Sequence, residues 1–161
     1  NEFVDELPLI VAHTGIKHHS GQFHKPIRDR WLEGEPKVVK AYNDIIELGR
    51  EGKKAIINKD WEHLGYLMNE NHRIQDELAD SGEQNNYMIK VARENGALGA
   101  KLAGAGGGGT IIALTLEPER TIKALKEAGV EEFIELDPKA AGVNVEYIDE
   151  GSYGTVATAL E

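Results

Sequence analysis

Cysteine is absent from the 161-residue sequence, so it can form neither a disulfide nor a thiolate metal site. Positive charge is scarce, with 18 basic against 28 acidic residues and a net charge of −10. Nucleic acid and anionic membranes attract proteins with a basic face, so we expect neither as the main partner. No apolar run approaches the roughly 20 residues that a membrane-spanning helix needs. These absences lead us to expect a cytoplasmic protein.

Aromatic residues are few, at 6% of the chain, but 40% of all residues are hydrophobic and 29% are charged. This balance is typical of a globular protein, and the length suffices for one domain with a hydrophobic core. The chain opens at Asn1, and its first apolar run follows within a few residues. We therefore weigh a fragment of a longer protein against a domain with a trimmed tail.

The first two thirds of the chain are predicted to be mainly helical. Residues 7–14 form an apolar, β-branched run that indicates a buried strand, and residues 16–35 indicate a loop with a short helix at 27–32. Hydrophobic residues then recur at helical spacing. They predict a helix from Pro36 that weakens near Gly49, a second ending near Ser81, and a third from Gln84 to Glu94. Tyr42 and Tyr87 are expected to face inward, and His72 to lie on a solvated face.

The last third is predicted to be mainly strands. The pattern indicates strands at 97–103, 110–116, 132–136 and 143–148, with a helix at 118–128 and an ambiguous tail at 149–161. Strands and helices are partly segregated, which favours an α+β fold in which an antiparallel sheet carries helices on one face. We expect a single domain with its core at 7–148.

A glycine-rich loop is the most informative stretch of the sequence. It comprises Gly104, Ala105, Gly106, Gly107, Gly108 and Gly109. Glycine loses much backbone entropy on folding, so such a run is favoured where the backbone turns sharply or lies against a ligand. Successive N–H groups without side chains can point at one anion, typically a phosphate. The alternative is a flexible hairpin without a ligand.

Two familiar nucleotide motifs do not fit this loop. Gly104, Gly106 and Gly109 satisfy the dinucleotide pattern G-x-G-x-x-G, but that pattern must open a helix. Here the β-branched residues from Thr110 onward predict a strand. A Gly-Lys-Ser/Thr sequence, which a Walker P-loop requires, is also missing. The expected arrangement is therefore strand, glycine loop, strand.

The segment Gly96–Leu114, with Gly-Ala-Lys-Leu-Ala-Gly-Ala-Gly-Gly-Gly-Gly at its centre, resembles the third conserved motif of the GHMP kinases. That superfamily includes galactokinase, homoserine kinase and mevalonate kinase. The resemblance covers roughly residues 7–148 and implies the ferredoxin-like C-terminal domain of these enzymes. It further implies ATP and Mg²⁺ as cofactors and the chain's own N-terminal domain as partner. The catalytic residues and the main ATP motif would lie in that other half, so no catalytic residue and no metal ligand is assigned here.

A narrower resemblance concerns the residues that follow the first strand. The spacing of Ser20, Gly21, His24, Arg28 and Arg30 is similar to a segment of the plant-type glucuronokinases, which phosphorylate a sugar acid. These five residues and Thr14 are the substrate-binding candidates.

Each candidate has a plainer alternative. A guanidinium fork suits a carboxylate or a phosphate, but either arginine could equally be ion-paired within the chain. The histidines of this region match no metal-binding spacing.

The sequence thus predicts the C-terminal domain of an ATP-dependent kinase that acts on a sugar or sugar acid. The full run of glycines is closer to mevalonate kinase, which is the alternative acceptor class. An alternative from another class is a ligand-binding or regulatory module without catalysis. By itself this chain is expected to be inactive, and its oligomeric state is left open.

Overall fold

The computed structural model describes residues 7–15, 21–104, 109–134 and 136–137. In chain order its elements are β1 (Leu9–His13), α1 (Gly21–Leu32), α2 (Pro36–Asn58), α3 (Trp61–Ala79), α4 (Glu83–Glu94), β2 (Ala97–Ala103), β3 (Thr110–Thr115), α5 (Pro118–Glu127) and β4 (Glu132–Ile134). The predicted strand at 143–148 and the tail at 149–161 lie outside the described residues.

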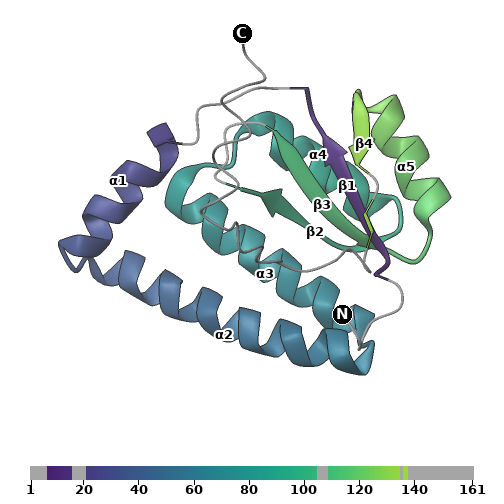
Figure 1. Cartoon of the computed structure of the whole chain (residues 1–161). Helices are drawn as coiled ribbons and strands as arrows, with labels where there is room; N and C mark the ends of the chain where they lie inside the picture. Colours follow the sequence, from purple (N-terminus) through teal and green to yellow (C-terminus); the bar gives the residue numbers. More distant parts are fainter. Residues whose placement is uncertain (1–6, 16–20, 105–108, 135, 138–161) are drawn as a thin grey trace, which may run out of the picture.

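The strands form one antiparallel sheet with the spatial order β2-β3-β1-β4 (Figure 1). β1 pairs with β3 from Leu9 opposite Leu114 to His13 opposite Thr110. These two apolar strands occupy the centre of the sheet, and the shorter β4 lies at one edge. The order of elements and strands is that of a ferredoxin-like domain with extra helices between β1 and α4. The predicted α+β fold class is confirmed.

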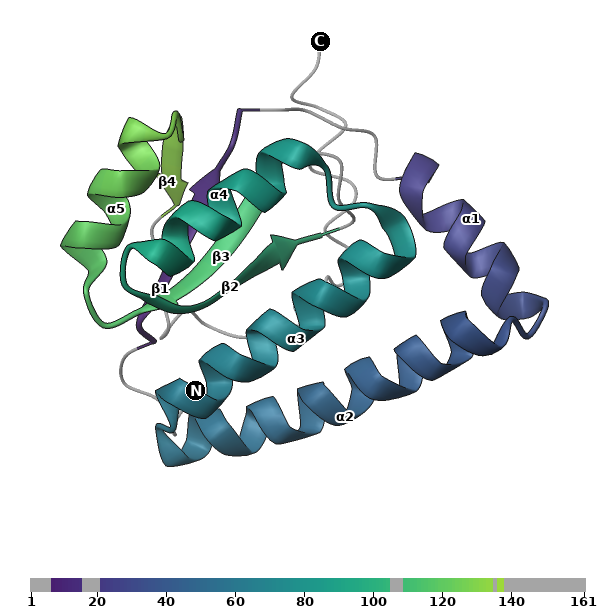
Figure 2. The ribbon, with the colours of Figure 1, turned by 180° about the vertical axis from the view of Figure 1, so that it is seen from behind.

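Helices α4 and α5 cover one face of the sheet (Figure 2). Because side chains alternate along a strand, every second residue of β1 and β3 points to these helices. The resulting core cluster contains Ile10, Ala12, Met88, Ile89, Ala92, Ala97, Ala100, Ile111, Ala113, Leu125 and Val130. The small residues of the strands let both helices approach the sheet closely, which places the main hydrophobic core between these two layers.

Helix α3 runs along the edge strand β2 at very short range. A Cβ atom added to Gly99 would lie 2.2 Å from the carbonyl oxygen of Gly65, and one added to Gly65 would lie 2.7 Å from the carbonyl carbon of Leu98. Both distances are far below van der Waals contact, so neither position accepts a larger residue without a shift of backbone. The two glycines thereby set the separation of α3 and β2.

One turn further along α3, the Asn69 side chain bridges the helix to the strand. Its Nδ2 donates to the carbonyl oxygen of Leu98 at 3.2 Å, and its Oδ1 accepts from the amide of Ala100 at 3.1 Å. An edge strand presents unpaired backbone groups, which are costly when they are covered without a partner. Asn69 satisfies one donor and one acceptor of β2 and so takes the place of a neighbouring strand.

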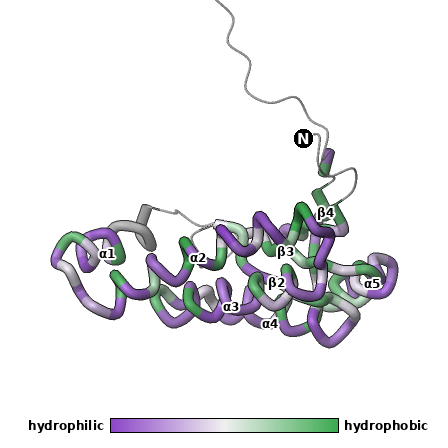
Figure 3. The backbone as a smooth tube through the Cα atoms, turned by 90° about the horizontal axis from the view of Figure 1, so that it is seen from below, coloured by the Kyte–Doolittle hydropathy of each residue, from purple (hydrophilic) through white to green (hydrophobic). Residues whose placement is uncertain are grey.

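Helix α2 forms an outer layer that packs on α3, and its extent differs from the prediction. It continues through Gly49 and Gly52 to Asn58, and Asp60 then caps α3 by accepting from the amide of His63. Packing on one side only leaves most of its surface in solvent, so Tyr42 is 41% exposed rather than inward. Figure 3 shows hydrophilic and hydrophobic segments alternating along α2. None of the described helices is long and apolar enough to cross a membrane.

Two further expectations are corrected. Helix α1 begins at Gly21 rather than near Ile27 and contains Pro26, whose missing N–H removes one hydrogen bond from the helix. Tyr87 of α4 is 51% exposed, because the face of α4 that meets the sheet is formed by Asn85, Met88 and Ile89 and their neighbours one turn on. The hydrophobic pattern fixed α4 as a helix, and the sheet determined which side is buried.

The contact between α3 and β2 is testable with a pair of alanine substitutions. Gly65→Ala should destabilise the protein by about 2 kcal/mol or more, because overpacking against the β2 backbone outweighs the helix propensity that alanine adds. The control is Gly49→Ala in α2, where an added Cβ meets no atom within 4 Å. It should be neutral or stabilising by up to ~1 kcal/mol. Urea unfolding measures both, and equal effects of the two substitutions would contradict the assigned contact.

Candidate functional site

The two ends of the glycine loop are held in register by the sheet. Ala103 at the end of β2 pairs with Thr110 at the start of β3, so the chain leaves and re-enters the sheet at neighbouring positions. Gly104 has a φ of +110° and Gly109 a φ of +99°, values that favour glycine. The predicted order of strand, glycine loop and strand is confirmed. Residues 105–108 lie outside the described part, and their contact with a phosphate stays a prediction.

The end of β1 anchors the distal end of the loop. The backbone amide of Thr14 donates to the carbonyl oxygen of Gly109 at 2.7 Å, and the Thr14 hydroxyl donates to the same oxygen at 2.9 Å. The amide of Gly109 donates in return to the Thr14 hydroxyl at 3.2 Å. His13 adds a fourth bond from its Nδ1 to the Gly109 carbonyl at 2.9 Å. Thr14 is buried, so the first role of this substrate-binding candidate is to hold the loop.

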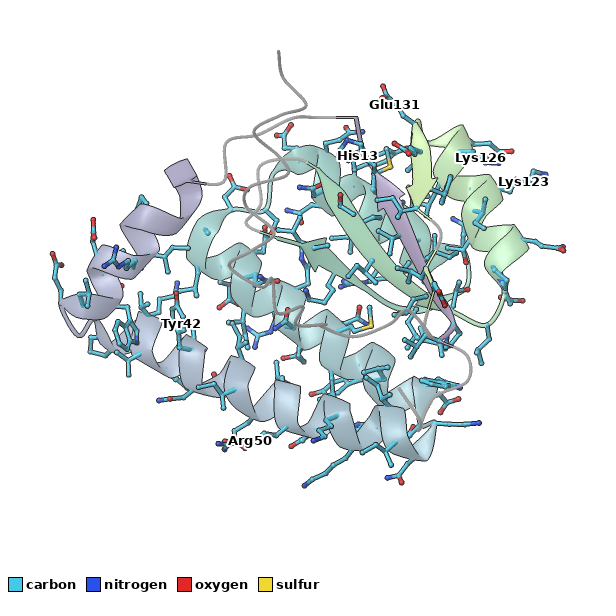
Figure 4. The ribbon with its side chains drawn as sticks, in the orientation of Figure 1. His13, Tyr42, Arg50, Lys123, Lys126 and Glu131 are labelled. Atoms are coloured by element: carbon cyan, nitrogen blue, oxygen red, sulfur yellow. The ribbon has the colours of Figure 1, made fainter. Side chains whose placement is uncertain are left out.

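The same end of the sheet receives the segment before β4. The amide of Glu131 donates to the carbonyl oxygen of His13 at 3.3 Å, and a Cβ atom on Gly15 would lie 2.5 Å from the Glu131 carboxyl carbon. Figure 4 shows His13 and Glu131 at this end of the molecule. Three connections therefore converge here, from β1, from the glycine loop and from the start of β4. The sequence gives no spacing that points to His13 or Glu131 as neighbours of the loop, because they are far apart in the chain.

The remaining candidates follow β1 into helix α1. Gly21 is the first residue of α1 and His24 lies in its first half, whereas Ser20 and the side chain of His24 lie outside the described part. Arg28 is exposed on α1 and takes part in none of the ion pairs found among the described residues. Its role as a substrate-binding candidate therefore stays a prediction.

Arg30 is instead engaged within the chain. Its Nε and Nη2 donate to the two carboxylate oxygens of Glu35 at 2.6 and 2.7 Å, and its Nη1 reaches the carbonyl oxygen of Leu78 at 3.4 Å. The hydrogen bond from Arg30 lowers the pKa of the partly exposed Glu35 carboxyl. This bidentate pair closes the turn between α1 and α2, and the bond to Leu78 ties the turn to α3. For Arg30 the structure thus shows the alternative stated from the sequence, an arginine that is ion-paired within the chain.

A small cavity links α1 to the start of the glycine loop. Its volume is about 160 Å³, and its lining includes Ile27 of α1, Tyr42 of α2, Gln75 of α3, and Leu102 and Gly104 around the end of β2. Figure 4 shows Tyr42 on the part of α2 that faces α1. The structure thus brings the candidate helix and the first glycine of the loop to one place, although they are distant in sequence.

His72 is buried, not solvated as the sequence suggested. It lies on the side of α3 that faces α4, where its Nε2 donates to the Asn86 amide oxygen at 2.9 Å. Burial lowers the pKa of its imidazole, because the cation would lose hydration there. The Asn86 amide nitrogen in turn donates to Asp76 at 3.0 Å. These bonds join α3 to α4. Among the described residues, no group of three His, Asp or Glu side chains could hold a metal ion.

The family model for the C-terminal domain of GHMP kinases matches residues 53–135, which is more than half of the chain. The chain belongs to the GHMP kinase family. The matched region runs from the end of α2 to β4 and includes the whole strand, glycine loop and strand unit. The resemblance stated from the sequence is therefore confirmed.

Curated relatives of two specificities are similar to this GHMP kinase domain. The mevalonate kinase of Pyrococcus furiosus is 34% identical over 130 residues, which cover 77% of this chain and 39% of that protein. Probable glucuronokinase 2 of Arabidopsis thaliana is 32% identical over 123 residues, covering 74% of this chain and 33% of that protein. The chain thus spans less than half the length of these relatives.

A solved structure gives the same assignment of the fold. The L. major mevalonate kinase in complex with R-mevalonate superposes with a TM-score of 0.77 and 26% identity, covering 86% of this chain and 45% of that one.

Removing the Thr14 hydroxyl tests the anchor of the glycine loop. Thr14→Val leaves the Gly109 amide without its acceptor and should cost about 1–3 kcal/mol of unfolding free energy. Hydrogen exchange of the Gly109 amide should accelerate. Thr14→Ser, which retains the hydroxyl, should stay close to the parent protein. Unchanged stability and exchange in Thr14→Val would show that the loop is held by other contacts.

Proposed function

We propose that this domain forms the acceptor-side wall of an ATP-dependent kinase, which transfers the γ-phosphoryl group to a hydroxyl of a small hydroxy acid. Family membership supports phosphoryl transfer as the reaction. The anchored glycine loop supports the proposal that the reaction occurs beside this loop. The full protein would combine this chain with a second, N-terminal domain, since the curated relatives are more than twice as long. The catalytic residues belong to that domain in this proposal.

The loop backbone meets the transferred phosphate in this proposal. The amide of Gly109 donates to Thr14, so this proposal assigns the anion to other amides of the glycine run. An added Cβ on Gly104 would meet no described atom within 4 Å, so none of the described residues occupies the space beside the start of the loop. When bound, ATP supplies the phosphoryl group and Mg²⁺ neutralises its charge. No described side chain is assigned to the metal.

The acceptor class follows from what the two kinds of relatives share. Glucuronate and mevalonate are both hydroxy acids, so each carries a carboxylate in addition to the hydroxyl that accepts the phosphoryl group. Arg28 is the guanidinium of α1 that remains available for such a carboxylate, because Glu35 already occupies the fork of Arg30. We propose a sugar acid of the glucuronate type as the acceptor, and mevalonate as the second candidate. The alternative to a kinase is a non-catalytic module that binds such a ligand without turnover.

A coupled ATP-consumption assay of the full-length protein separates these functions. Glucuronate, mevalonate and galactose are offered as acceptors with ATP and Mg²⁺. Turnover should appear with one of the two hydroxy acids and stay at background with galactose, which lacks the carboxylate. Turnover with galactose alone would refute the acceptor class. Calorimetric binding of an acid without any turnover would establish the non-catalytic module instead.

A substitution in the glycine run tests the role of its backbone. Gly106→Val should lower kcat by at least about 100-fold, because a branched side chain keeps the phosphate from the main-chain amides. The unfolding midpoint should change little, since the pairing of Ala103 with Thr110 and the bonds of Gly109 to Thr14 are retained. Thr110→Val, which places a branched side chain in β3 just after the loop, is the control and should keep most of the activity. Unchanged kcat in Gly106→Val would show that the loop backbone does not contact the transferred phosphate.

A further inference from the structure

A second and larger cavity lies away from the glycine loop, between α2 and α3. Its volume is about 780 Å³, within the range of small-molecule binding sites. Its walls are mainly aliphatic and are formed by Ile45, Leu48, Ile56, Leu64, Leu67 and Met68, together with the glycines of α2. We call this cavity the α2–α3 groove. Apolar surface of this extent in one concavity is uncommon unless something covers it.

The charged residues that line the groove are all positive. Lys53, Asn71 and Lys101 line it, and none of its lining residues is acidic. This is unusual in a chain that has 28 acidic and 18 basic residues. The α2–α3 groove is therefore complementary in charge to an anion, in contrast to the acidic protein around it.

Lys101 is the central cation of the groove. It projects from β2 between the buried residues Ala100 and Leu102, and its Nζ donates to the Leu102 carbonyl oxygen at 2.6 Å. Burial lowers the pKa of its ammonium group. No carboxylate of the described residues forms an ion pair with it. A partly buried cation that no described carboxylate pairs with is unfavourable, and an anion placed beside it reduces that penalty.

We propose that the α2–α3 groove binds a single-chain amphiphile, with its anionic head at Lys101 and Asn71 and its aliphatic chain along Leu48, Leu64 and Met68. The head gains a charge-assisted hydrogen bond from the lysine, and the chain buries apolar surface at about 25 cal/mol per Å². A polar sugar would satisfy the lysine but leave the aliphatic walls uncovered. A neutral apolar chain would cover the walls but leave the charge unmatched. The combination of both features selects the amphiphile.

Isothermal titration calorimetry of the full-length protein tests the site with decanoate, decyl phosphate, decanol and decyltrimethylammonium as probes. At least one of the two anions should bind at least about tenfold more tightly than decanol, which corresponds to about 1.4 kcal/mol. The cation should show no binding. The two anionic probes distinguish a carboxylate from a phosphate head. Since binding is measured without turnover, the result is independent of the proposed kinase activity.

Three lysine variants assign the head group to its site. Lys101→Met keeps the length of the side chain and should weaken binding of the anion about tenfold or more, while decanol binding changes less than about threefold. Lys101→Arg keeps the charge and should restore most of the affinity. The matched control is Lys54→Met, an exposed lysine of α2 outside the groove, which should bind like the parent protein. Melting temperatures confirm that each variant is folded.

Several results would overturn the proposal. Equal affinity for decanol and the anions would show that the groove binds apolar chains but has no site for an anionic head group. Unchanged anion affinity in Lys101→Met would place the head group elsewhere. Failure of both anions to bind the full-length protein would mean that another part of the protein fills the α2–α3 groove.

Discussion

The close contact between α3 and β2 is the constraint on which the extra helices of this domain depend. At Gly65 and Gly99 the two backbones approach to a distance that excludes a Cβ atom, and Asn69 closes the gap beyond them by bonding to Leu98 and Ala100. The edge strand is thereby paired without another strand. Helix α2 packs on α3, and α1 is tied to α3 through Arg30. A change in the α3–β2 distance would therefore displace all three helices relative to the sheet.

The same frame determines where the glycine loop lies. β2 delivers the chain to Gly104, and β3 and Thr14 receive it at Gly109. Both anchors are backbone or hydroxyl contacts at one end of the sheet, so the loop is fixed at its ends whatever its side chains are. The sheet thereby determines where Gly104 and Gly109 lie, although glycine has the greatest conformational freedom of all residues. The amide of Gly109 serves this anchor, because it donates to the Thr14 hydroxyl.

Charge is distributed unevenly around this frame. Several basic side chains on the helix surfaces are paired with nearby carboxylates, as Arg73 is with Glu70 and Glu77, and such exposed pairs contribute little stability. Lys101 differs because it is partly buried and faces aliphatic side chains. It precedes Gly104 by three residues on the same strand. The α2–α3 groove and the glycine loop are thus two features of one strand, with β2 connecting them.

The sequence by itself determined the elements that depend on local pattern. The alternation and β-branching of 110–116, the glycine run, and the helical spacing in α3 and α4 fixed the order of strands and helices, and the motif around Gly104 identified the family. Tertiary structure alone decided which side of each element is buried and which partners distant residues meet. Tyr42 and Tyr87 are exposed, and His72 is buried. Arg30 reaches the carbonyl oxygen of Leu78, and Thr14 meets Gly109. Burial and such hydrogen bonds depend on neighbours that are far away in the chain. Periodicity reports the shape of one segment, whereas these contacts arise only when β2, β3 and α3 are placed side by side.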